Sequence, residues 1–386
     1  MKTLKESLLS DIDDTLKQGD NDLKEIVKNF LKANYNRSSK FKISRKPNAD
    51  GLYEVTYPSI LIPKDLSITK LTNDLFTFTE VYGVNFSQCS SLTSLKGLPK
   101  SLKGPLFISS CKSLTTLEDC PKSIVGDFDC YGCINLKSLV GCPQNAVNFC
   151  CGSCRSLTTL EGCPVEVRDF DCNNCNGLTT LKGGPKVVSN DYECYACTNL
   201  KSLEGGPDNV GHNFNCRKCP NLESLKGGPK EVGNFFLCEE NQSLKSLEGG
   251  PEKVGNVYSL LECRSLTSLK GIAKSIKGIL NCGGCSSLTS LEGCPKSVGF
   301  GNTENTEGVP GMLLSWCTSL TSLKGCPERV NGNFYINNCK NLTSLDYCPE
   351  TVTGMFACYG CGKEFTQDEV AYLCNVKSGI IKTSRY

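Results

Sequence analysis

The stretch DCPKSIVGDFDCYGCINLKSL, residues Asp119–Leu139, shows the repeating unit of this 386-residue chain. Its pattern is P-x-x-I-x-x-x-F-x-C-x-x-C-x-x-L-x-x-L. The first leucine of the closing pair returns every 21 or 22 residues, with one step of 32. A fixed period in this range is typical of a solenoid, in which each unit packs only on its neighbours. These leucines are Leu92, Leu114, Leu136, Leu157, Leu178, Leu200, Leu222, Leu244, Leu266, Leu288, Leu320 and Leu342.

Each unit has room for one strand, two turns and a short extended or 3₁₀ segment, but not for a long helix. Apolar residues alternate around the F-x-C step, as a strand requires. Pro and Gly after each leucine pair mark the place where the chain turns back. Strands of successive units then stack in parallel at ~4.8 Å. The sequence therefore predicts a repeat solenoid with a parallel β-sheet along one face.

The residues F-x-C-x-x-C-x-x-L-x-x-L resemble the leucine-rich repeat family in its cysteine-containing form. The phrase C-x-SLTSL-x-x-x-P-x-x-V is also similar to BspA-like repeats and to the short repeats of bacterial effectors. The resemblance covers Ile68 to Phe365. It implies an arc with the parallel sheet on its concave face and little helix on its convex face. It also implies that partners bind to the concave face.

Most of the 28 cysteines occupy recurring positions of the unit. The position three residues before the first leucine of the closing pair holds twelve cysteines, and Asn241 is its thirteenth occupant. Asparagine is the usual residue there in the resembled family, where it bonds backbone groups of the turn. The resemblance thus implies that the thiols perform a weaker version of this role by S–H donation. We expect reduced, buried thiols, which fit a cytosol-like compartment.

Seven C-x-x-C pairs raise the alternative of a zinc or redox site. The first cysteine of the pair is replaced by Phe86, Ile108 or Leu260 in other units. A metal ligand does not tolerate such replacement, whereas free cysteine packs as a small apolar residue. We therefore predict structural thiols, no metal site and no cofactor.

The chain divides into four segments. Residues 1–19 form a charged leader, and residues 20–67 are read as an N-terminal cap with a helix (20–35) and a β-hairpin (41–43 and 52–57). About 13 repeats span residues 68–365, with one insertion at 299–308. A Thr366–Glu369 capping box opens a short C-terminal capping helix within residues 366–386. Caps of this kind cover the open core at each end of a solenoid.

Composition and motifs argue against several functions. Lys plus Arg is 42 and Asp plus Glu is 40, which provides no electrostatic attraction to nucleic acid or to an anionic membrane. No apolar run reaches the ~20 residues of a spanning helix. The only histidine, His212, has no evident partner, and no phosphate loop or nucleophile elbow occurs. We expect a protein that is not an enzyme.

The alternation of the strand aims a set of acidic and aromatic residues out of the predicted sheet. The acidic pairs offer oxygen ligands for a divalent cation as a minor alternative. Aromatic residues beside charges on an exposed sheet suit protein recognition, and the alternative is an ordinary solvated face. We predict a monomer that binds a protein partner with a basic surface through Asp127, Asp129, Tyr131, Asp169, Asp171, Asp191, Glu193, Tyr195, Trp316 and Tyr335.

A second outward row follows each leucine pair. From Glu161 onward its charges alternate in sign at every unit, through Lys182 and Glu204 to Asp346. Stacked units place each of these charges between two opposite ones. Each exposed pair contributes only ~0.2–1 kcal/mol, but a slip by one repeat would set like charges together. We interpret this row as a determinant of stacking register.

The leader MKTLKESLLSDIDD is similar to N-termini of tailed-phage proteins, and phage-encoded repeat proteins of the C-x-SLTSLEG-x-P style are similar to the array. This resemblance implies a phage protein located in the bacterial cytoplasm or in the phage particle. We therefore interpret the chain as a non-catalytic, protein-binding leucine-rich-repeat scaffold. The alternative is a structural or decoration component of the particle, and a metal-dependent or thiol redox enzyme is a distant third.

Overall fold

The computed structural model describes residues 22–35, 41–69, 71–72, 75–300 and 309–385. It contains two compact units, Met1–Cys151 with Gly162–Pro164 and Gly152–Glu161 with Val165–Tyr386. Both are stretches of parallel β-solenoid, with about 14 turns in all and very little helix, as the repeat predicts. The expected leader (1–19) and residues 301–308 of the insertion lie outside the described residues.

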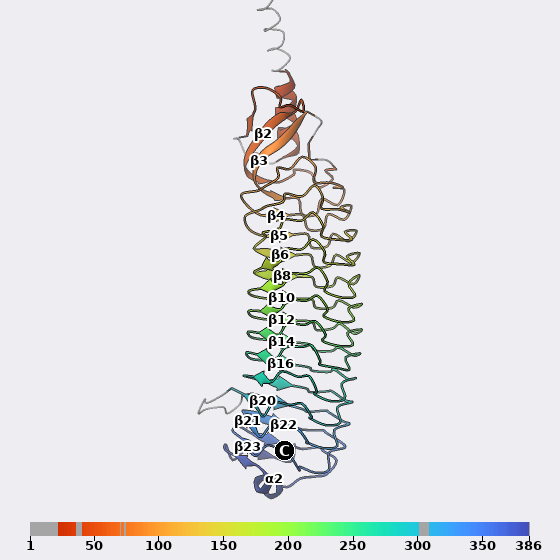
Figure 1. The fold of residues 1–386 in the computed structure, drawn as a ribbon, viewed down its shortest axis with the longest axis vertical. Helices are drawn as coiled ribbons and strands as arrows, with labels where there is room; N and C mark the ends of the chain where they lie inside the picture. Colours follow the sequence, from red (N-terminus) through yellow and green to blue (C-terminus); the bar gives the residue numbers. More distant parts are fainter. Residues whose placement is uncertain (1–21, 36–40, 70, 73–74, 301–308, 386) are drawn as a thin grey trace, which may run out of the picture. The chain divides into compact units, whose positions relative to one another are not determined.

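Unit 1 begins with long elements and continues with short ones (Figure 1). Residues 22–34 are helical, and β1 pairs antiparallel with β2. The next pair, β2 and β3, is parallel and has two shifts of register. Strand β2 is longer than the 52–57 segment expected from the sequence, and the extension of β3 back to Phe76 was not expected. The strand order follows the chain: β1 (Lys42–Ile43), β2 (Tyr53–Leu61), β3 (Phe76–Asn85), β4 (Leu106–Phe107), β5 (Phe128–Asp129) and β6 (Asn148–Cys150).

Unit 2 carries most of the F-x-C strands of the repeat, which form its first sheet together with one strand of the C-terminal tail. Neighbouring strands pair in parallel, and Figure 1 shows them at successive levels. The strands are β8 (Asp169–Asp171), β10 (Tyr192–Glu193), β12 (Phe214–Asn215), β14 (Phe236–Leu237), β16 (Tyr258–Ser259), β18 (Leu280–Asn281), β20 (Pro310–Leu313), β22 (Asn333–Tyr335), β24 (Phe356–Ala357) and β26 (Ile381–Lys382).

A second parallel sheet in unit 2 was not expected from the sequence. It is built by the P-x-x-V step of each repeat, where only an extended segment was predicted. Each of these strands except the last, β25, buries one apolar side chain, such as Val188 at 1% or Val210 at 2% exposed, which is too short a pattern to show periodicity. The strands are β7 (Glu166–Val167), β9 (Val187–Val188), β11 (Asn209–Val210), β13 (Glu231–Val232), β15 (Lys253–Val254), β17 (Ser275–Ile276), β19 (Ser297–Gly299), β21 (Arg329–Asn331), β23 (Thr351–Val352) and β25 (Asn375–Val376).

The S-L-T-S-L phrase supplies both core and turn. Its leucines are buried; Leu200 and Leu203, for example, are 0% exposed. Its last hydroxyl residue bonds the backbone two residues on: the Glu204 N–H donates to Ser202 Oγ at 3.4 Å, and the Glu161 N–H to Thr159 Oγ1 at 3.1 Å. This bond fixes the turn after the strand-like leucine segment, which explains why Ser or Thr recurs there.

The cysteine positions behave as the sequence predicts. All 28 cysteines are free thiols, and most are buried. Thiols of the recurring position donate to a backbone carbonyl of the preceding turn, as Cys263 does to the Cys238 oxygen at 2.9 Å. Asn241, which replaces the cysteine in one turn, makes two such backbone hydrogen bonds. Its Nδ2 donates to the Cys216 oxygen at 3.1 Å, and its Oδ1 accepts from the Cys219 N–H at 2.8 Å.

The aromatic residues of four successive strands, β10 to β16, form a stack inside unit 2. Ring centroids lie 5.0 Å apart between Tyr192 and Phe214, 5.6 Å between Phe214 and Phe236, and 4.8 Å between Phe236 and Tyr258. Tyr258 is fully buried, and its hydroxyl has no hydrogen-bond partner among the described residues. Burial raises the pKa of Tyr258 well above its usual range.

Replacing Tyr258 with phenylalanine is expected to raise the free energy of unfolding by about 1 kcal/mol, because the change removes a buried unsatisfied hydroxyl and keeps the ring. The reverse change in the neighbouring ring, Phe236→Tyr, is the matched control and is expected to destabilise. Chemical denaturation of both variants measures the effect. A loss of stability in Tyr258→Phe would show that the hydroxyl has a partner.

Helix α2 (Gln367–Leu373) follows the last repeat. Thr366 is its N-cap, and the capping box predicted for Thr366 and Glu369 is present. The helix contacts β25 and β26, and Val370 is buried. The Gln367 side chain donates to the Ile381 carbonyl of β26 at 3.1 Å.

Candidate interaction surface

The structure separates the predicted site residues. Asp127, Asp129 and Tyr131 lie in unit 1, and the remaining predicted residues lie in unit 2. In unit 2 the outward residues of the first sheet form one register row. The row runs Asp171, Glu193, Asn215, Leu237, Ser259, Asn281, Leu313 and Tyr335. Asn215 and Ser259 are buried within it. Its start is acidic and its end is apolar and aromatic.

The acidic side chains before the aromatic residue satisfy the backbone of the next turn. Asp169 Oδ1 accepts from the Asp191 N–H at 3.2 Å, and Asp191 Oδ1 accepts from the Asn213 N–H at 3.0 Å. Asn213 and Asn333 make the same bond in other turns. The carboxylates therefore have a structural role that an amide also fulfils.

The acidic side chains after the aromatic residue bond within their own turn. Asp171 Oδ1 accepts from the Asn173 N–H at 2.8 Å, as Asn215 does from Arg217 at 3.2 Å and Asn281 from Gly283 at 3.0 Å. In unit 1, Asp129 bonds the Tyr131 N–H in the same way at 2.8 Å. This is an Asx turn, which Asp and Asn form equally.

Glu193 belongs to a chain of polar contacts across the sheet. Its Oε2 accepts from Asn215 Nδ2 at 2.7 Å, and Asn215 Oδ1 accepts from Arg217 Nε at 3.1 Å. Arg217 lies 3.6 Å from Glu239, which accepts from Ser259 Oγ at 2.7 Å. Burial and the neighbouring carboxylates raise the pKa of Glu193, although the Asn215 bond opposes the shift. The charged form of Glu193 is therefore less favourable here than it is for an exposed glutamate.

Tyr195 lies beside positive charges as well as negative ones. The Arg217 guanidinium is 5.8 Å from its ring centroid and the Lys218 ammonium is 5.7 Å away. Each cation also lies near a carboxylate: Arg217 is 3.6 Å from Glu239, and Lys218 is 3.7 Å from Glu240. The acidic area that the sequence predicts is therefore partly neutralised within unit 2.

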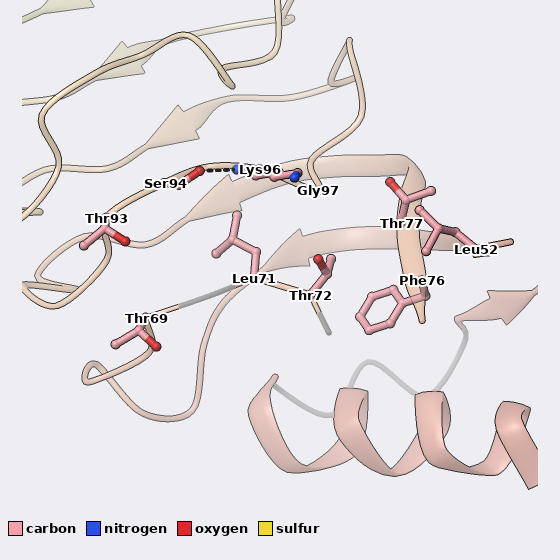
Figure 2. Close-up of a pocket in the computed structure, with 10 residues that line it drawn as sticks. All are labelled: Leu52, Thr69, Leu71, Thr72, Phe76, Thr77, Thr93, Ser94, Lys96 and Gly97. Carbon is pink, nitrogen blue, oxygen red and sulfur yellow. Dashed lines mark hydrogen bonds between the residues drawn. The ribbon is translucent and has the colours of Figure 1, made fainter. Parts of the chain in front are cut away.

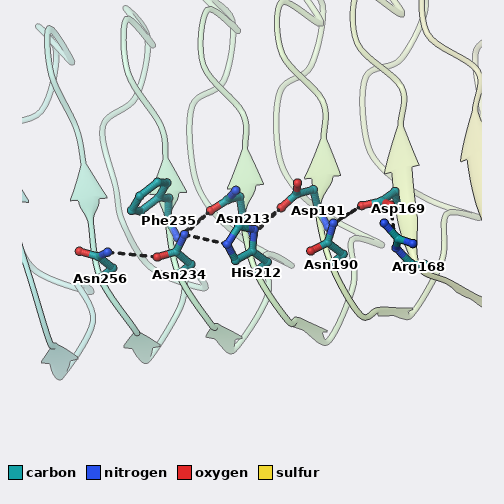
Figure 3. Close-up of polar contacts among 9 residues, drawn as sticks. All are labelled: Arg168, Asp169, Asn190, Asp191, His212, Asn213, Asn234, Phe235 and Asn256. Atoms are coloured by element: carbon teal, nitrogen blue, oxygen red, sulfur yellow. Dashed lines mark hydrogen bonds and ion pairs between the residues drawn. The ribbon is translucent and has the colours of Figure 1, made fainter.

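His212 has partners, contrary to the sequence expectation. Its Nδ1 lies 2.8 Å from Asp191 Oδ1, and its Nε2 lies 3.0 Å from Asn234 Nδ2 (Figure 3). The sequence offered no sign of this because the partners are one turn away, 21 and 22 residues along the chain. Asn190 and Asn256 extend the row, with Asn190 Nδ2 2.6 Å from Asp169 Oδ1 and Asn256 Nδ2 3.1 Å from Asn234 Oδ1.

Trp316 combines a large exposed apolar side chain with a left-handed backbone conformation. Its side chain is 53% exposed, and its φ is 68°, in the left-handed region. The equivalent position is left-handed in the other turns as well, where it holds small or polar residues such as Asn174 and Asn338. Sequence reasoning named Trp316 but missed this conformation, because the position has no fixed residue type.

The apolar end of the row lies next to Trp316 in the chain. Leu313 pairs with Tyr335 in the β20–β22 register, and both are half-buried. The Trp316 N–H donates to the Asn337 carbonyl at 2.9 Å. Tyr335 keeps its hydroxyl as an acceptor for Asn333 Nδ2 at 2.8 Å. Leu313, Trp316 and Tyr335 are called the aromatic patch below.

Part of the row with alternating charges forms the ion pairs that its sequence predicts. Lys182 lies 3.2 Å from Glu204, and Glu292 lies 3.4 Å from Lys270 and 3.5 Å from Lys324. Hydrogen bonds from these two lysines hold the pKa of Glu292 below its usual range. The pairs join consecutive turns, which is the arrangement that a register determinant requires.

A hollow of about 580 Å³ lies in unit 1 (Figure 2). Lys96 is the one charged group in its described lining, so no acid–base pair is present there. Elsewhere in the described chain, no group of three or more His, Cys, Asp or Glu side chains is placed to hold a metal ion. None of the described helices is long and apolar enough to cross a membrane. The other lining residues are Leu52, Thr69, Leu71, Thr72, Phe76, Thr77, Thr93, Ser94 and Gly97.

Comparison with known proteins adds no relative to this description. No protein-family model, no curated protein and no solved structure matches the chain.

Proposed function

We propose that the chain is a non-catalytic scaffold of the cysteine-containing leucine-rich-repeat type, which binds a protein partner through the first-sheet surface of unit 2. The observation that carries the proposal is Trp316. Its left-handed φ belongs to the turn, since Lys218, Glu240 and Glu262 have it too, so what sets Trp316 apart is its exposed indole. Half of this large apolar side chain lies in water.

Packing offers no reason for tryptophan at this position. Other turns hold the same conformation with Ser153, Asn174 or Ala196. Tryptophan is among the residue types enriched at the energetic hot spots of protein interfaces. Leu313, at the end of β20 just before Trp316, and Tyr335 on the neighbouring strand β22 add half-buried apolar and aromatic groups to the surface. The aromatic patch therefore supplies the main contact in this proposal.

The acidic end of the row supplies a second contact. Asp171 and Glu193 are half-buried, and Asp191 adds a third carboxylate nearby. The strands β10 and β20 are five steps of ~4.8 Å apart, which is roughly 24 Å. A partner that reaches both areas carries an apolar recess and, at that distance, a basic segment. Because Asn serves equally well in the turns, the carboxylates are retained for their charge.

The test compares binding by the full chain and by Trp316→Ala. Capture from bacterial lysate first supplies a partner, which is then purified and titrated. Trp316 is the single tryptophan, so its emission reports the titration with a partner protein engineered to lack tryptophan. Loss of the side chain is expected to weaken binding by about 30-fold, the effect of a typical interface hot spot. Calorimetry measures the variant, which has no tryptophan signal.

Two matched variants complete the test. Tyr372→Ala removes an aromatic residue that is 89% exposed on α2, and it is expected to bind as the parent does. The double variant Asp171→Asn, Glu193→Gln keeps the turn bonds and is expected to weaken binding mainly at low salt. It is also expected to be slightly more stable, since the pKa of Glu193 is raised. Equal binding by Trp316→Ala and the parent would refute the proposal.

A further inference from the structure

The side chain of His212 belongs to a chain of hydrogen bonds that crosses successive turns of unit 2 (Figure 3). Asparagine holds the same position in the neighbouring turns, as Asn190, Asn234 and Asn256. The backbone at this position is paired from turn to turn: the His212 N–H donates to the Asn190 carbonyl at 3.0 Å, and the Asn234 N–H donates to the His212 carbonyl at 2.8 Å. His212 is therefore the one titratable side chain among these four polar positions.

A backbone amide fixes the orientation of the two asparagine side chains that follow His212. The Phe235 N–H donates to Asn213 at 3.2 Å, so the atom that Asn213 presents is its Oδ1 oxygen. Asn234 lies 3.0 Å from the same oxygen and must present its Nδ2 to it. The second hydrogen of this NH₂ group serves His212 Nε2, which is 3.0 Å away. On its other side, Asn234 Oδ1 accepts from Asn256 Nδ2 at 3.1 Å.

These contacts determine where the imidazole ring carries its proton. Because Nε2 faces a donor, it is the accepting nitrogen, and the ring hydrogen of the neutral form is then on Nδ1. Nδ1 lies 2.8 Å from Asp191 Oδ1, an acceptor that suits an N–H donor. Both sides of the ring therefore select the neutral Nδ1–H form.

The charged groups near the ring all lie on one side of it. The preceding turn presents Asp191, and the turn before that presents Asp169, whose Oδ2 is 3.2 Å from Arg168 Nε. The following turn presents Asn234 and Phe235, which carry no charge (Figure 3). The Asp191 contact suits the ring in both protonation states. A proton added to Nε2, however, would face Asn234 Nδ2, one donor against another.

We propose that His212 is a pH switch, whose protonation turns over the Asn234 amide and releases it from Asn213. The rotated Asn234 accepts from the new Nε2–H through its Oδ1. Its Nδ2 then points toward Asn256, whose amide reverses as well. The Asn213 oxygen meets an oxygen in place of a donor, and its bond to the Phe235 N–H is weakened. Protonation of one ring nitrogen is thereby transmitted to a backbone amide of the next turn.

The switch acts where the chain enters the first sheet. Phe235 directly precedes β14, as Asp191 directly precedes β10. A weaker bond at the Phe235 N–H therefore loosens the start of β14. This change does not require a partner, so it is measurable on the chain alone.

The protonation state of the ring is the first measurement. His212 is the only histidine, so the full chain labelled with ¹⁵N-histidine gives one imidazole spectrum that needs no assignment. The spectrum of the neutral ring is expected to show a hydrogen on Nδ1 and none on Nε2. A neutral ring with its hydrogen on Nε2 would overturn the proposal.

Amide hydrogen exchange at Phe235, corrected for its intrinsic dependence on pH, is the second measurement. Between about pH 8 and pH 5, the range in which histidine changes charge, the imidazole spectrum reports protonation. Protection of Phe235 is expected to fall about fivefold over that change, as one hydrogen bond is weakened. The Met355 N–H donates to Asn333 Oδ1 at 2.7 Å in a turn without histidine, and it is expected to keep its protection.

His212→Asn is the matched variant, because it restores the residue type of the neighbouring turns and retains Asp191. Asn256 shows that an amide reaches Asn234 across one turn. The variant is expected to keep Phe235 protected over the whole pH range, and thermal unfolding checks that it is folded. The response of Phe235 in the parent does not depend on this variant. A parent without any fall at Phe235, or an equal fall in His212→Asn, would show that His212 is not the switch.

Discussion

Gly205→Ala is expected to lower the free energy of unfolding by about 3 kcal/mol or more. Gly205 has φ +85°, a conformation that costs a residue with a Cβ roughly 1–2 kcal/mol. An added Cβ would also lie 2.5 Å from Lys182 Cα and 2.7 Å from Lys182 N in the preceding turn. Those atoms belong to the backbone, so the overlap is relieved only by moving a whole turn.

The control separates the two causes. Gly379 has φ +68°, and an added Cβ would meet nothing within 4 Å. Gly379→Ala is therefore expected to cost only the conformational part, about 1 kcal/mol. Urea denaturation of both variants, followed by circular dichroism, gives the two free energies. If the two losses are equal, turn-to-turn contact is not what restricts this position to glycine.

The sequence predicts the solenoid because the repeat dictates it at several levels at once. The leucine pair sets the core, the F-x-C step sets the first sheet, and the Pro and Gly residues set the turns. The second sheet was missed because β9 or β11 contributes two residues and one buried valine, and a two-residue strand has no visible period. It exists only by pairing with the turns before and after it.

The candidate surface was predicted less completely than the fold. The alternation of the strand identified Asp171 and Glu193 as outward, and the structure places both in one row. Their hydrogen bonds, like those of His212, run to residues of their own or a neighbouring turn, which the spacing does not specify. The left-handed conformation of Trp316 was also invisible, since it is fixed by the turn and not by the residue.

Asn241→Ala is expected to lower the free energy of unfolding by about 3 kcal/mol. Asn241 is 0% exposed, and its side chain satisfies both the Cys219 N–H and the Cys216 carbonyl. Alanine leaves the Cys216 carbonyl without this donor and opens a small cavity. Each buried polar group left unsatisfied costs about 1–3 kcal/mol.

Asn241→Cys tests whether a cysteine thiol at this position stabilises the turn as the asparagine side chain does. Where cysteine occupies this position, its thiol reaches the carbonyl 25 residues before it, as Cys285 reaches Leu260 at 3.2 Å. In Asn241→Cys the Cys219 N–H loses the Asn241 oxygen as its acceptor. The equivalent N–H in another turn, that of Cys263, bonds the Leu260 carbonyl of its own turn at 3.0 Å, and the Cys219 N–H can bond its own turn in the same way.

Cysteine at position 241 is therefore expected to recover most of the loss, to within about 1 kcal/mol of the parent. Hydrogen exchange at the Cys219 amide should rise in Asn241→Ala more than in Asn241→Cys. If Asn241→Cys is as unstable as Asn241→Ala, the S–H donation contributes nothing. The cysteines at this recurring position then stabilise the fold by apolar packing alone, and cysteine is selected there for its size.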